Sequence, residues 1–329
     1  MLLLMLGVAA SPLSRAAADS SQLRILVAGV DKQIYLPVTL AARLGYFKAQ
    51  GVDIELLSEP SGVNAEDELL AGSVQGVVGF YDHTITLQAK GKLVQSVVQL
   101  ALAPGEAVLV AAARAQAIRS PADFSGKRLG ITGLGSSTQF LTAYLGVQHG
   151  VRQANMTMVA AGSGDRFIQA MRQGRIDAGM STEPTVSRLI KSGDARLLLD
   201  LRTPQATASE LGGLYPAACL YMTRLWISTH PAQAQQLANA LVLALRYIAG
   251  HSAQEITAQM PAEFFGGDRA LYVEALQASQ AMFSPDGVMP PSGPATVLKV
   301  LKAVDRAVGS KTIDLSKTYT TEFVRAVPP

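Results

Sequence analysis

The chain has 329 residues, enough for two lobes with separate hydrophobic cores. Its composition, 49% hydrophobic and 16% charged, is typical of a globular protein and excludes a disordered one. The net charge of +3 is too small to indicate nucleic-acid binding. One cysteine, Cys219, excludes an internal disulfide and a cysteine-based metal site, and the histidines have no ligand-like spacing, so we expect neither metal nor cofactor.

The N-terminal segment has the features of a secretory signal. Leu2–Ala10 is apolar but too short to span a bilayer, and the small residues Ala16-Ala17-Ala18 follow it. We predict a signal peptide over residues 1–18 and an exported, periplasmic protein. No Lys or Arg precedes the apolar run, which leaves open a start site further upstream, and a buried N-terminal helix is the alternative.

Strand-like and helical patterns alternate from Arg24 to Asp200. A helix is predicted over Leu36–Gln50, and Asn64 is predicted to cap the next one. Such alternation favours an α/β fold with mostly parallel sheets, and from His230 onward the pattern is helical. The strand-like runs are 24–29, 52–57, 77–80, 93–102, 108–113, 128–132, 156–160, 177–180 and 196–200.

An internal similarity indicates two lobes of the same design. A shift of 102 residues places Ser61-Gly62 on Ser163-Gly164 and Gly72 on Gly174, and it also aligns Leu87 with Leu189 and Gly91 with Gly193. Most of these identities are glycines or Ser-Gly turns that punctuate the chain. We therefore predict that a ligand binds in the cleft between the lobes.

Ligands of open parallel sheets lie beyond the carboxyl ends of the strands. Six segments follow the predicted strands and would converge there: 31–35, 60–62, 80–83, 134–138, 162–164 and 181–184. The candidate ligand-binding residues within them are Gln33, Tyr35, Ser61, Gly62, Tyr81, Asp82, His83, Gly135, Ser136, Ser137, Thr138 and Glu183.

The Gly133–Thr138 loop falls one residue short of the dinucleotide fingerprint G-x-G-x-x-G. That fingerprint needs an acidic residue about twenty positions later, and residues 152–156 contain none. Free backbone N–H groups and three hydroxyls at a helix start favour a small anion instead. The alternative interpretation is that Ser136 or Ser137 only caps the helix.

Two further polar groups have alternative interpretations. Tyr81 is expected to contact the ligand, with a charge from Asp82 or His83; alternatively Asp82 caps a helix and His83 faces solvent. Glu183 could accept a ligand N–H or join the lobes, or Glu183-Pro184 could only begin a helix.

Catalytic motifs are absent from the sequence. It has no G-x-S-x-G, HExxH, Walker A or C-x-x-C motif, so we predict a protein that is not an enzyme. An acid/base pair of Glu183 and His83 across the cleft stays open, because sequence does not give their distance.

The stretch Leu44–Glu55 (LGYFKAQGVDIE) resembles the "LGYFKxxGVDVE" segment of periplasmic substrate-binding proteins of ABC importers. The resemblance is to the nitrate/sulfonate/taurine class, which includes proteins that bind thiamine-pyrimidine precursors. Further matches, in the expected order, are 69–72 (LLAG), 123–130 (DFSGKRLG), 135–138 (GSST), 170–178 (AMRQGRIDA) and 183–184 (EP). The chain departs from the class where Ser181-Thr182 replaces an aromatic residue before Glu183.

The resemblance implies a two-lobed, type II-like periplasmic binding fold, each lobe a mostly parallel sheet flanked by helices, with a helical C-terminal part. Lobe I would comprise residues 19–106 and 218–329, and lobe II residues 107–217. The protein would be a monomer that delivers a small organic anion, of sulfonate or carboxylate type, to a membrane permease driven by a separate ATPase. A periplasmic sensor subunit and an enzyme on the same fold are the alternatives.

Overall fold

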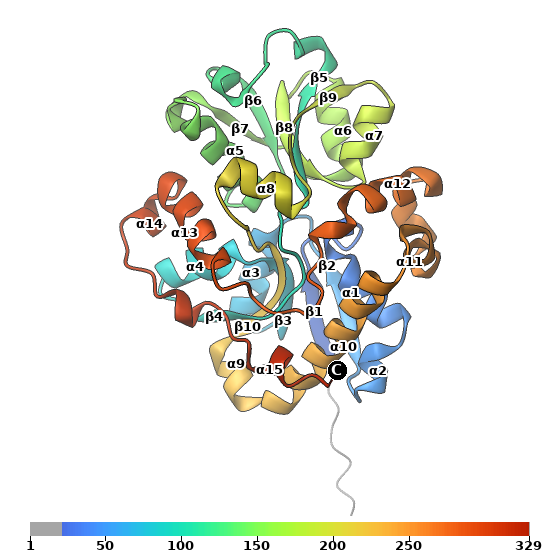
Figure 1. Ribbon diagram of the computed structural model, residues 1–329. Coiled ribbons are helices and arrows are strands. Elements are labelled where there is room, and N and C mark those ends of the chain that lie inside the picture. The colour runs from blue at the N-terminus through green and yellow to red at the C-terminus, as the bar shows by residue number, and fades with distance from the viewer. Residues whose placement is uncertain (1–21, 329) are drawn as a thin grey trace, which may run out of the picture.

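Two five-stranded sheets organise residues 22–328, the part of the chain that the computed structural model describes (Figure 1). The predicted signal peptide lies outside these residues. The strand order of the first sheet is β2 (Ile54–Ser58), β1 (Leu23–Val27), β3 (Gly76–Phe80), β10 (Ala218–Thr223) and β4 (Val94–Gln99). That of the second is β7 (Thr157–Ala160), β6 (Arg128–Ile131), β8 (Ala178–Thr182), β5 (Glu106–Ala111) and β9 (Ala195–Leu201).

One strand of each sheet runs against the others. β10 is antiparallel to β3 and β4, and β5 is antiparallel to β8 and β9. Each is the first strand after the chain passes from one sheet to the other. The prediction of a two-lobed α/β fold with mostly parallel sheets is therefore confirmed. Glu106, which the predicted division assigns to lobe I, is the first residue of β5 in the second sheet.

The helices of the first lobe begin close to the predicted places. The predicted helix over 36–50 is two helices, α1 (Leu36–Arg43) and α2 (Tyr46–Ala49), because the chain turns at Gly45 with a φ of 72°. The N-cap of α3 (Gly62–Ala71) is Ser61, so Asn64 lies inside the helix and does not cap it. The short η1 (Gln33–Tyr35) precedes α1, and α4 (Asp82–Ala89) follows β3.

The second lobe repeats this arrangement. Its helices are α5 (Ser137–Gln148), α6 (Gly164–Arg172), α7 (Thr185–Lys191) and α8 (Pro204–Leu211). Ser163 is the N-cap of α6 and Gly164 its first residue, as Ser61 and Gly62 are for α3. The internal similarity in the sequence thus marks equivalent helix starts.

The C-terminal part is helical, as predicted, and contacts both lobes (Figure 1). Its helix α10 packs on α1 and α2, whereas α13 packs on α5 of the second lobe. Its helices are α9 (Arg224–Thr229), α10 (Pro231–Gly250), α11 (Ala253–Gln259), α12 (Arg269–Ser279), α13 (Gly293–Val304), α14 (Arg306–Gly309) and α15 (Glu322–Arg325).

The central strands β3 and β5 are buried along their whole length, because helices cover both faces of each sheet. The core joins residues of both sheets, and a smaller cluster packs beneath α6 and α7. Within residues 22–328, no helix has the length and apolarity needed to cross a membrane.

Candidate functional site

A small cavity lies between the two sheets. Its volume is about 20 Å³, roughly the space of one water molecule. The residues that line it come from both lobes: Lys32, Tyr35, Gly62, Phe80, His83, Glu106, Thr132, Ser136, Ser137, Thr138 and Thr182. All of them except Glu106 lie at or just after the carboxyl ends of β1, β2, β3, β6 and β8, where a ligand of an α/β protein is expected.

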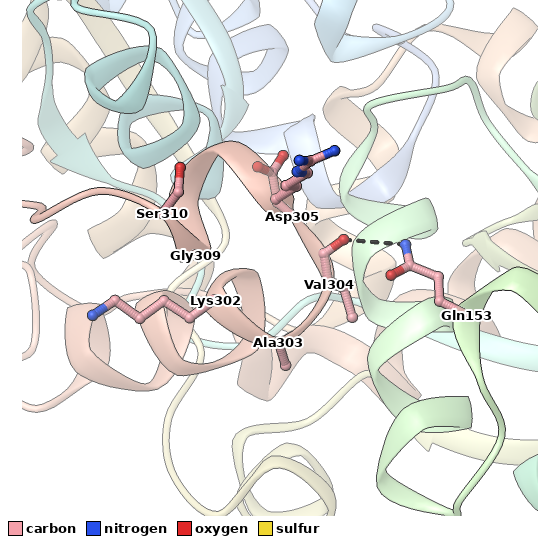
Figure 2. Close-up of a pocket in the computed structure, with 8 residues that line it drawn as sticks. Gln153, Lys302, Ala303, Val304, Asp305, Gly309 and Ser310 are labelled. Atoms are coloured by element: carbon pink, nitrogen blue, oxygen red, sulfur yellow. Dashed lines mark hydrogen bonds between the residues drawn. The ribbon is translucent and has the colours of Figure 1, made fainter.

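Direct contacts between the lobes surround this cavity. The Ser137 hydroxyl donates to Asp82 Oδ1 at 3.1 Å, and the Gln33 N–H donates to the Glu183 carbonyl at 3.1 Å. A third contact lies farther out, where Gln153 Nε2 donates to the carbonyl of Val304 at 3.1 Å (Figure 2). That contact borders an open groove of about 410 Å³ beside α13 and α14, away from the strand ends. The lobes are therefore closed on each other.

Half of the predicted site residues line the cavity: Tyr35, Gly62, His83, Ser136, Ser137 and Thr138. Tyr35 is buried and packs edge-on against Phe80, with rings 6.4 Å apart. Gly62 leaves space for His83, since a Cβ there would lie 2.8 Å from the His83 ring. These positions give the cavity an aromatic wall and a polar wall.

Other predicted residues are held elsewhere by hydrogen bonds. Gln33 donates through Nε2 to the Tyr272 carbonyl at 2.8 Å, and the Tyr81 hydroxyl bonds to Thr318 Oγ1 at 2.5 Å. Tyr81 therefore faces the C-terminal part and not the cavity. Ser61 and Gly135 lie beside the cavity, where the lobes touch: a Cβ on Gly135 would be 3.2 Å from Val63.

Glu183 is engaged within its own lobe. Its Oε1 accepts from Arg202 Nη1 at 2.5 Å and from the Ser187 hydroxyl at 2.9 Å, and its Oε2 accepts from the Ser187 N–H. The carboxylate thus anchors the start of α7, which is the alternative that the sequence analysis left open. Its backbone carbonyl, not its side chain, joins the lobes through Gln33. The structure does not bring it to His83 as an acid/base pair.

His83 and Asp82 form a buried cluster with Glu66 on α3. The His83 Nδ1 contacts the Glu66 carboxylate, and its Nε2 lies 3.6 Å from Asp82 Oδ1. Burial lowers the pKa of His83 to about 3, and the positive charge of Lys90 lowers it further. Burial also raises the pKa of Asp82 to about 7, against hydrogen bonds from Ser137 and Tyr215 that lower it. His83 does not face solvent, and Asp82 does not face the cavity.

The start of α5 forms the polar wall of the second lobe. Ser136 is its N-cap and accepts from the Gln139 N–H, as one interpretation of the sequence expected. Ser136, Thr132 and Thr138 also bond to one another at 2.7–2.9 Å, which fixes their hydroxyls at the cavity. Two helix starts, those of α5 and α3, line the same cavity from opposite lobes, and helix N-termini attract negative charge.

Lys32 adds a positive charge that the sequence analysis missed. It is 6% exposed, and its Nζ donates to the carbonyls of Ala28 at 2.6 Å and Pro60 at 3.1 Å. Burial lowers its pKa to about 8, so that the ammonium form still predominates at neutral pH. Lys32 lies in the 31–35 segment that was predicted to reach the ligand, but only Gln33 and Tyr35 of that segment were predicted to contact it.

Glu106 and Thr182 were also missed. Both are buried, and they lie opposite each other on the antiparallel strands β5 and β8. Glu106 could have been identified from the sequence, because it is the one acidic residue of an otherwise apolar strand. An unpaired carboxylate buried in such a strand costs folding free energy, which favours a functional role.

A larger chamber of about 370 Å³ lies at another part of the interface between the lobes. Asp31, Ser58 and Pro60 line it from the first lobe, and 162–166 from the second. The stem of Lys32 lies against Gly29 of this chamber, and its Nζ binds Pro60. Lys32 thus stands between the chamber and the cavity. All six strand-end segments of the sequence analysis therefore meet at this interface.

No group of three His, Cys, Asp or Glu residues within the described part of the chain is placed to hold a metal ion. Cys219 is buried, and burial raises the pKa of its thiol well above its usual range.

One solved structure closely resembles the whole chain. A protein of Bordetella bronchiseptica RB50 shares 35% identity, with a TM-score of 0.87 over 92% of this chain and 96% of that one. The alkanesulfonate-binding protein SsuA of Xanthomonas axonopodis pv. citri, bound to MOPS, has a TM-score of 0.72 at 21% identity, over 93% of this chain and 100% of that one. The second likeness shows the shared fold and agrees with the resemblance seen in the sequence.

A curated relative matches part of the chain. The 4-amino-5-hydroxymethyl-2-methylpyrimidine phosphate synthase THI13 of Saccharomyces cerevisiae is 32% identical over 155 residues. The match covers 45% of this chain and less than half, 42%, of the yeast protein. The family model described as NMT1/THI5 like matches residues 34–254, more than half of the chain. The chain therefore belongs to the NMT1/THI5-like family.

Proposed function

We propose that the protein is a periplasmic solute-binding protein of an ABC importer, which captures a small organic anion between its lobes. The observation that carries this proposal is the cavity between the sheets, lined from both lobes by buried polar side chains. Such a site is formed only where the lobes meet. Because the fully closed lobes leave only about 20 Å³, we expect them to close less tightly around a bound ligand.

The groups around the cavity favour an acidic ligand. The starts of α3 and α5 bring their unpaired backbone N–H groups to it, and Lys32 adds a full positive charge. The sulfonate compound bound to the related fold of SsuA is consistent with this chemistry. Sulfonates and carboxylates are therefore the ligand classes to test first.

We infer lobes of residues 19–105 with 218–329 and of residues 106–217, one residue from the predicted boundary because Glu106 begins β5, and these lobes close by rotation at the two passages between the sheets. A membrane permease with a separate ATPase would recognise the closed monomer. Export through the signal peptide at 1–18 would place the protein in the periplasm.

An enzyme is the second candidate, because the yeast relative is named as a synthase. Against it, the pair of Glu183 and His83 that the sequence left open is not formed, because Glu183 is bonded to Arg202 and Ser187 in its own lobe. Conversion of a bound compound, followed by mass spectrometry, would support the enzyme and contradict a role in binding alone. A sensor subunit would bind in the same way and differ only in its membrane partner.

The proposal is tested by a thermal-shift screen of sulfonates and carboxylates, followed by calorimetry on the best hit. Lys32→Met should lower the affinity for that hit at least tenfold, because it removes the cation and keeps the side-chain volume. Lys48→Met, on the exposed face of α2, is the control and should bind as the wild type does. Equal affinities for wild type and Lys32→Met would contradict the anion site, and a screen without any hit would contradict the function.

A further inference from the structure

Two acceptor atoms in the cavity have no partner. Glu106 is 2% exposed and Thr182 is 3% exposed, and both line the cavity. The buried atoms Glu106 Oε2 and Thr182 Oγ1 have no hydrogen-bond partner among residues 22–328. Because a buried polar atom without a partner is costly, it is a sign of a ligand group that satisfies it.

The sheet register holds these two side chains side by side. Glu106 pairs with Thr182 in the antiparallel ladder of β5 and β8, so both side chains project from the same face. Directly opposite residues have their Cβ atoms about 4.5–5.5 Å apart, a spacing at which one small group can contact both. The pair is thus a rigid feature of the sheet.

The charged neighbours do not satisfy Glu106. Lys32 lines the same cavity, but its Nζ is bonded to the carbonyls of Ala28 and Pro60. Asp82, the other charged group that acts on Glu106, has the same sign, and the nearby Tyr35 and Tyr215 are buried phenols. Burial raises the pKa of Glu106 well above its usual range, with the charge of Asp82 adding to it and that of Lys32 opposing it.

We propose that Glu106 and Thr182 bind an amino group of the ligand, so that the protein selects aminated organic acids over simple acids. This inference rests on the proposed function: the acidic group would lie toward Lys32 and the helix starts, and the amino group toward the sheet. The Glu106 carboxylate accepts from the ammonium in a charge-assisted hydrogen bond, and the Thr182 hydroxyl oxygen accepts another N–H.

Binding of an ammonium would also move a proton. A cation beside Glu106 favours its ionised form, so a carboxyl that is protonated in the empty cavity releases its proton when the ligand binds. Calorimetry at pH 7 in two buffers of different ionisation enthalpy measures this release. It should be present with an aminated ligand and absent in Glu106→Gln, which keeps the side-chain shape but cannot ionise.

The test uses matched probes that differ only by one amino group: 3-aminopropanoate with propanoate, and 3-aminopropanesulfonate with propanesulfonate. We expect the aminated member of the best-binding pair to bind at least tenfold more tightly. Glu106→Gln should remove most of this preference, and Thr182→Val should reduce it severalfold. Glu68→Gln, an exposed carboxylate on α3, is the control and should keep the preference.

The outcomes separate this inference from the function on which it rests. If simple acids bind as tightly as aminated ones, or if Glu106→Gln keeps the preference, the inference is wrong and the anion-binding function stands. If neither member of any pair binds, both are contradicted for these ligand classes. Circular dichroism and thermal unfolding of each variant show whether a lost preference results from a lost fold.

Discussion

Asp82 is a carboxyl group that the fold keeps only partly ionised at neutral pH. It is fully buried at the start of α4, where Ser137 and Tyr215 donate to its two oxygens at 3.1 and 3.2 Å. Ser137 belongs to the second lobe and Tyr215 to the passage between the lobes, so Asp82 links the closure of the lobes to its protonation state. Burial has the larger effect on its pKa and raises it from 3.8 to about 7.

The stability of the protein should therefore depend on pH through Asp82. Below pH 3.8 the group is protonated in both the folded and the unfolded chain, so it does not lower the free energy of unfolding. As the pH rises from about 4 to about 7, the unfolded chain ionises first, so the free energy of unfolding falls. A shift of about three pKa units corresponds to roughly 4 kcal/mol.

Asp82→Asn, which can still accept from Ser137, should remove this dependence. In urea denaturation at pH values from 4 to 8, the variant should gain stability relative to the wild type by up to about 4 kcal/mol as the pH rises. Asp67→Asn, an exposed position on α3, controls for the loss of one charge. A wild-type-to-variant difference that does not change with pH would show that the Asp82 carboxyl is not perturbed.

The neighbours of Asp82 show how far sequence reasoning reaches for single residues. The pattern at 81–83 placed a polar cluster at the end of a strand, which is correct. It did not show that the three side chains point in different directions: Tyr81 to Thr318, Asp82 to Tyr215 and His83 to the cavity. Those directions depend on the C-terminal part, which returns to the first lobe more than a hundred residues later.

Two neighbouring serines at the start of α5 have different roles. Ser136 caps the helix and also donates to the Gly133 carbonyl at 2.6 Å, so its bonds are local. The Ser137 hydroxyl reaches across to Asp82 in the other lobe. The first serine therefore stabilises the element, and the second joins two elements.

Substitution should separate these tasks. Ser136→Ala should lower the free energy of unfolding by about 1–2 kcal/mol, the usual cost of a lost N-cap. Ser137→Ala should cost less stability but weaken binding of the best hit severalfold, because closure loses a bond between the lobes. Urea denaturation and calorimetry measure the two effects.

A second cap supplies the control. Thr203 accepts from the Ala206 N–H at the start of α8 and does not line the cavity. Thr203→Ala should lose stability as Ser136→Ala does, but keep its affinity. If Ser137→Ala instead lost as much stability as Ser136→Ala with unchanged affinity, Ser137 would be only a structural residue.

Helices and strands were more predictable from the sequence than the pairing of residues between strands. The internal similarity correctly aligned Ser61-Gly62 with Ser163-Gly164, which the structure shows to be equivalent helix starts, although the first cap was predicted three residues later, at Asn64. The pairing of Glu106 with Thr182 was not predictable, since 75 residues of sequence lie between them and their register is a property of the sheet. The break at Gly45 was missed because the apolar pattern continues through it.

At the scale of the molecule, the cavity exists because the two lobes are in contact. The sequence predicted the two lobes and the six segments that meet between them. It could not predict how closely they meet, which depends on contacts such as Gly133 against Ser61 and Gln153 against Val304. The small volume of the cavity is a property of this closed arrangement, and rotation at the passages near 100–105 and 212–217 would enlarge it.

Closure can be fixed by a disulfide between the lobes. A Cβ on Gly133 would lie 3.3 Å from the Ser61 Cβ, close to the Cβ–Cβ distance of about 3.5–4.5 Å that disulfides require. Gly133 does not have a positive φ, so a cysteine there meets no left-handed strain. The native Cys219 is buried and should not compete for either new thiol.

The double variant Ser61→Cys/Gly133→Cys should therefore oxidise to a form with closed lobes, detected as a loss of two mass units and of two reactive thiols after denaturation. If the lobes must open to admit ligand, the oxidised form should bind the best hit at least a hundredfold more slowly than the reduced form, and reductant should restore the rate. Each single cysteine variant controls for the substitution itself. Equal rates before and after reduction would mean that ligand enters without separation of the lobes, and closure would then have no role in capture.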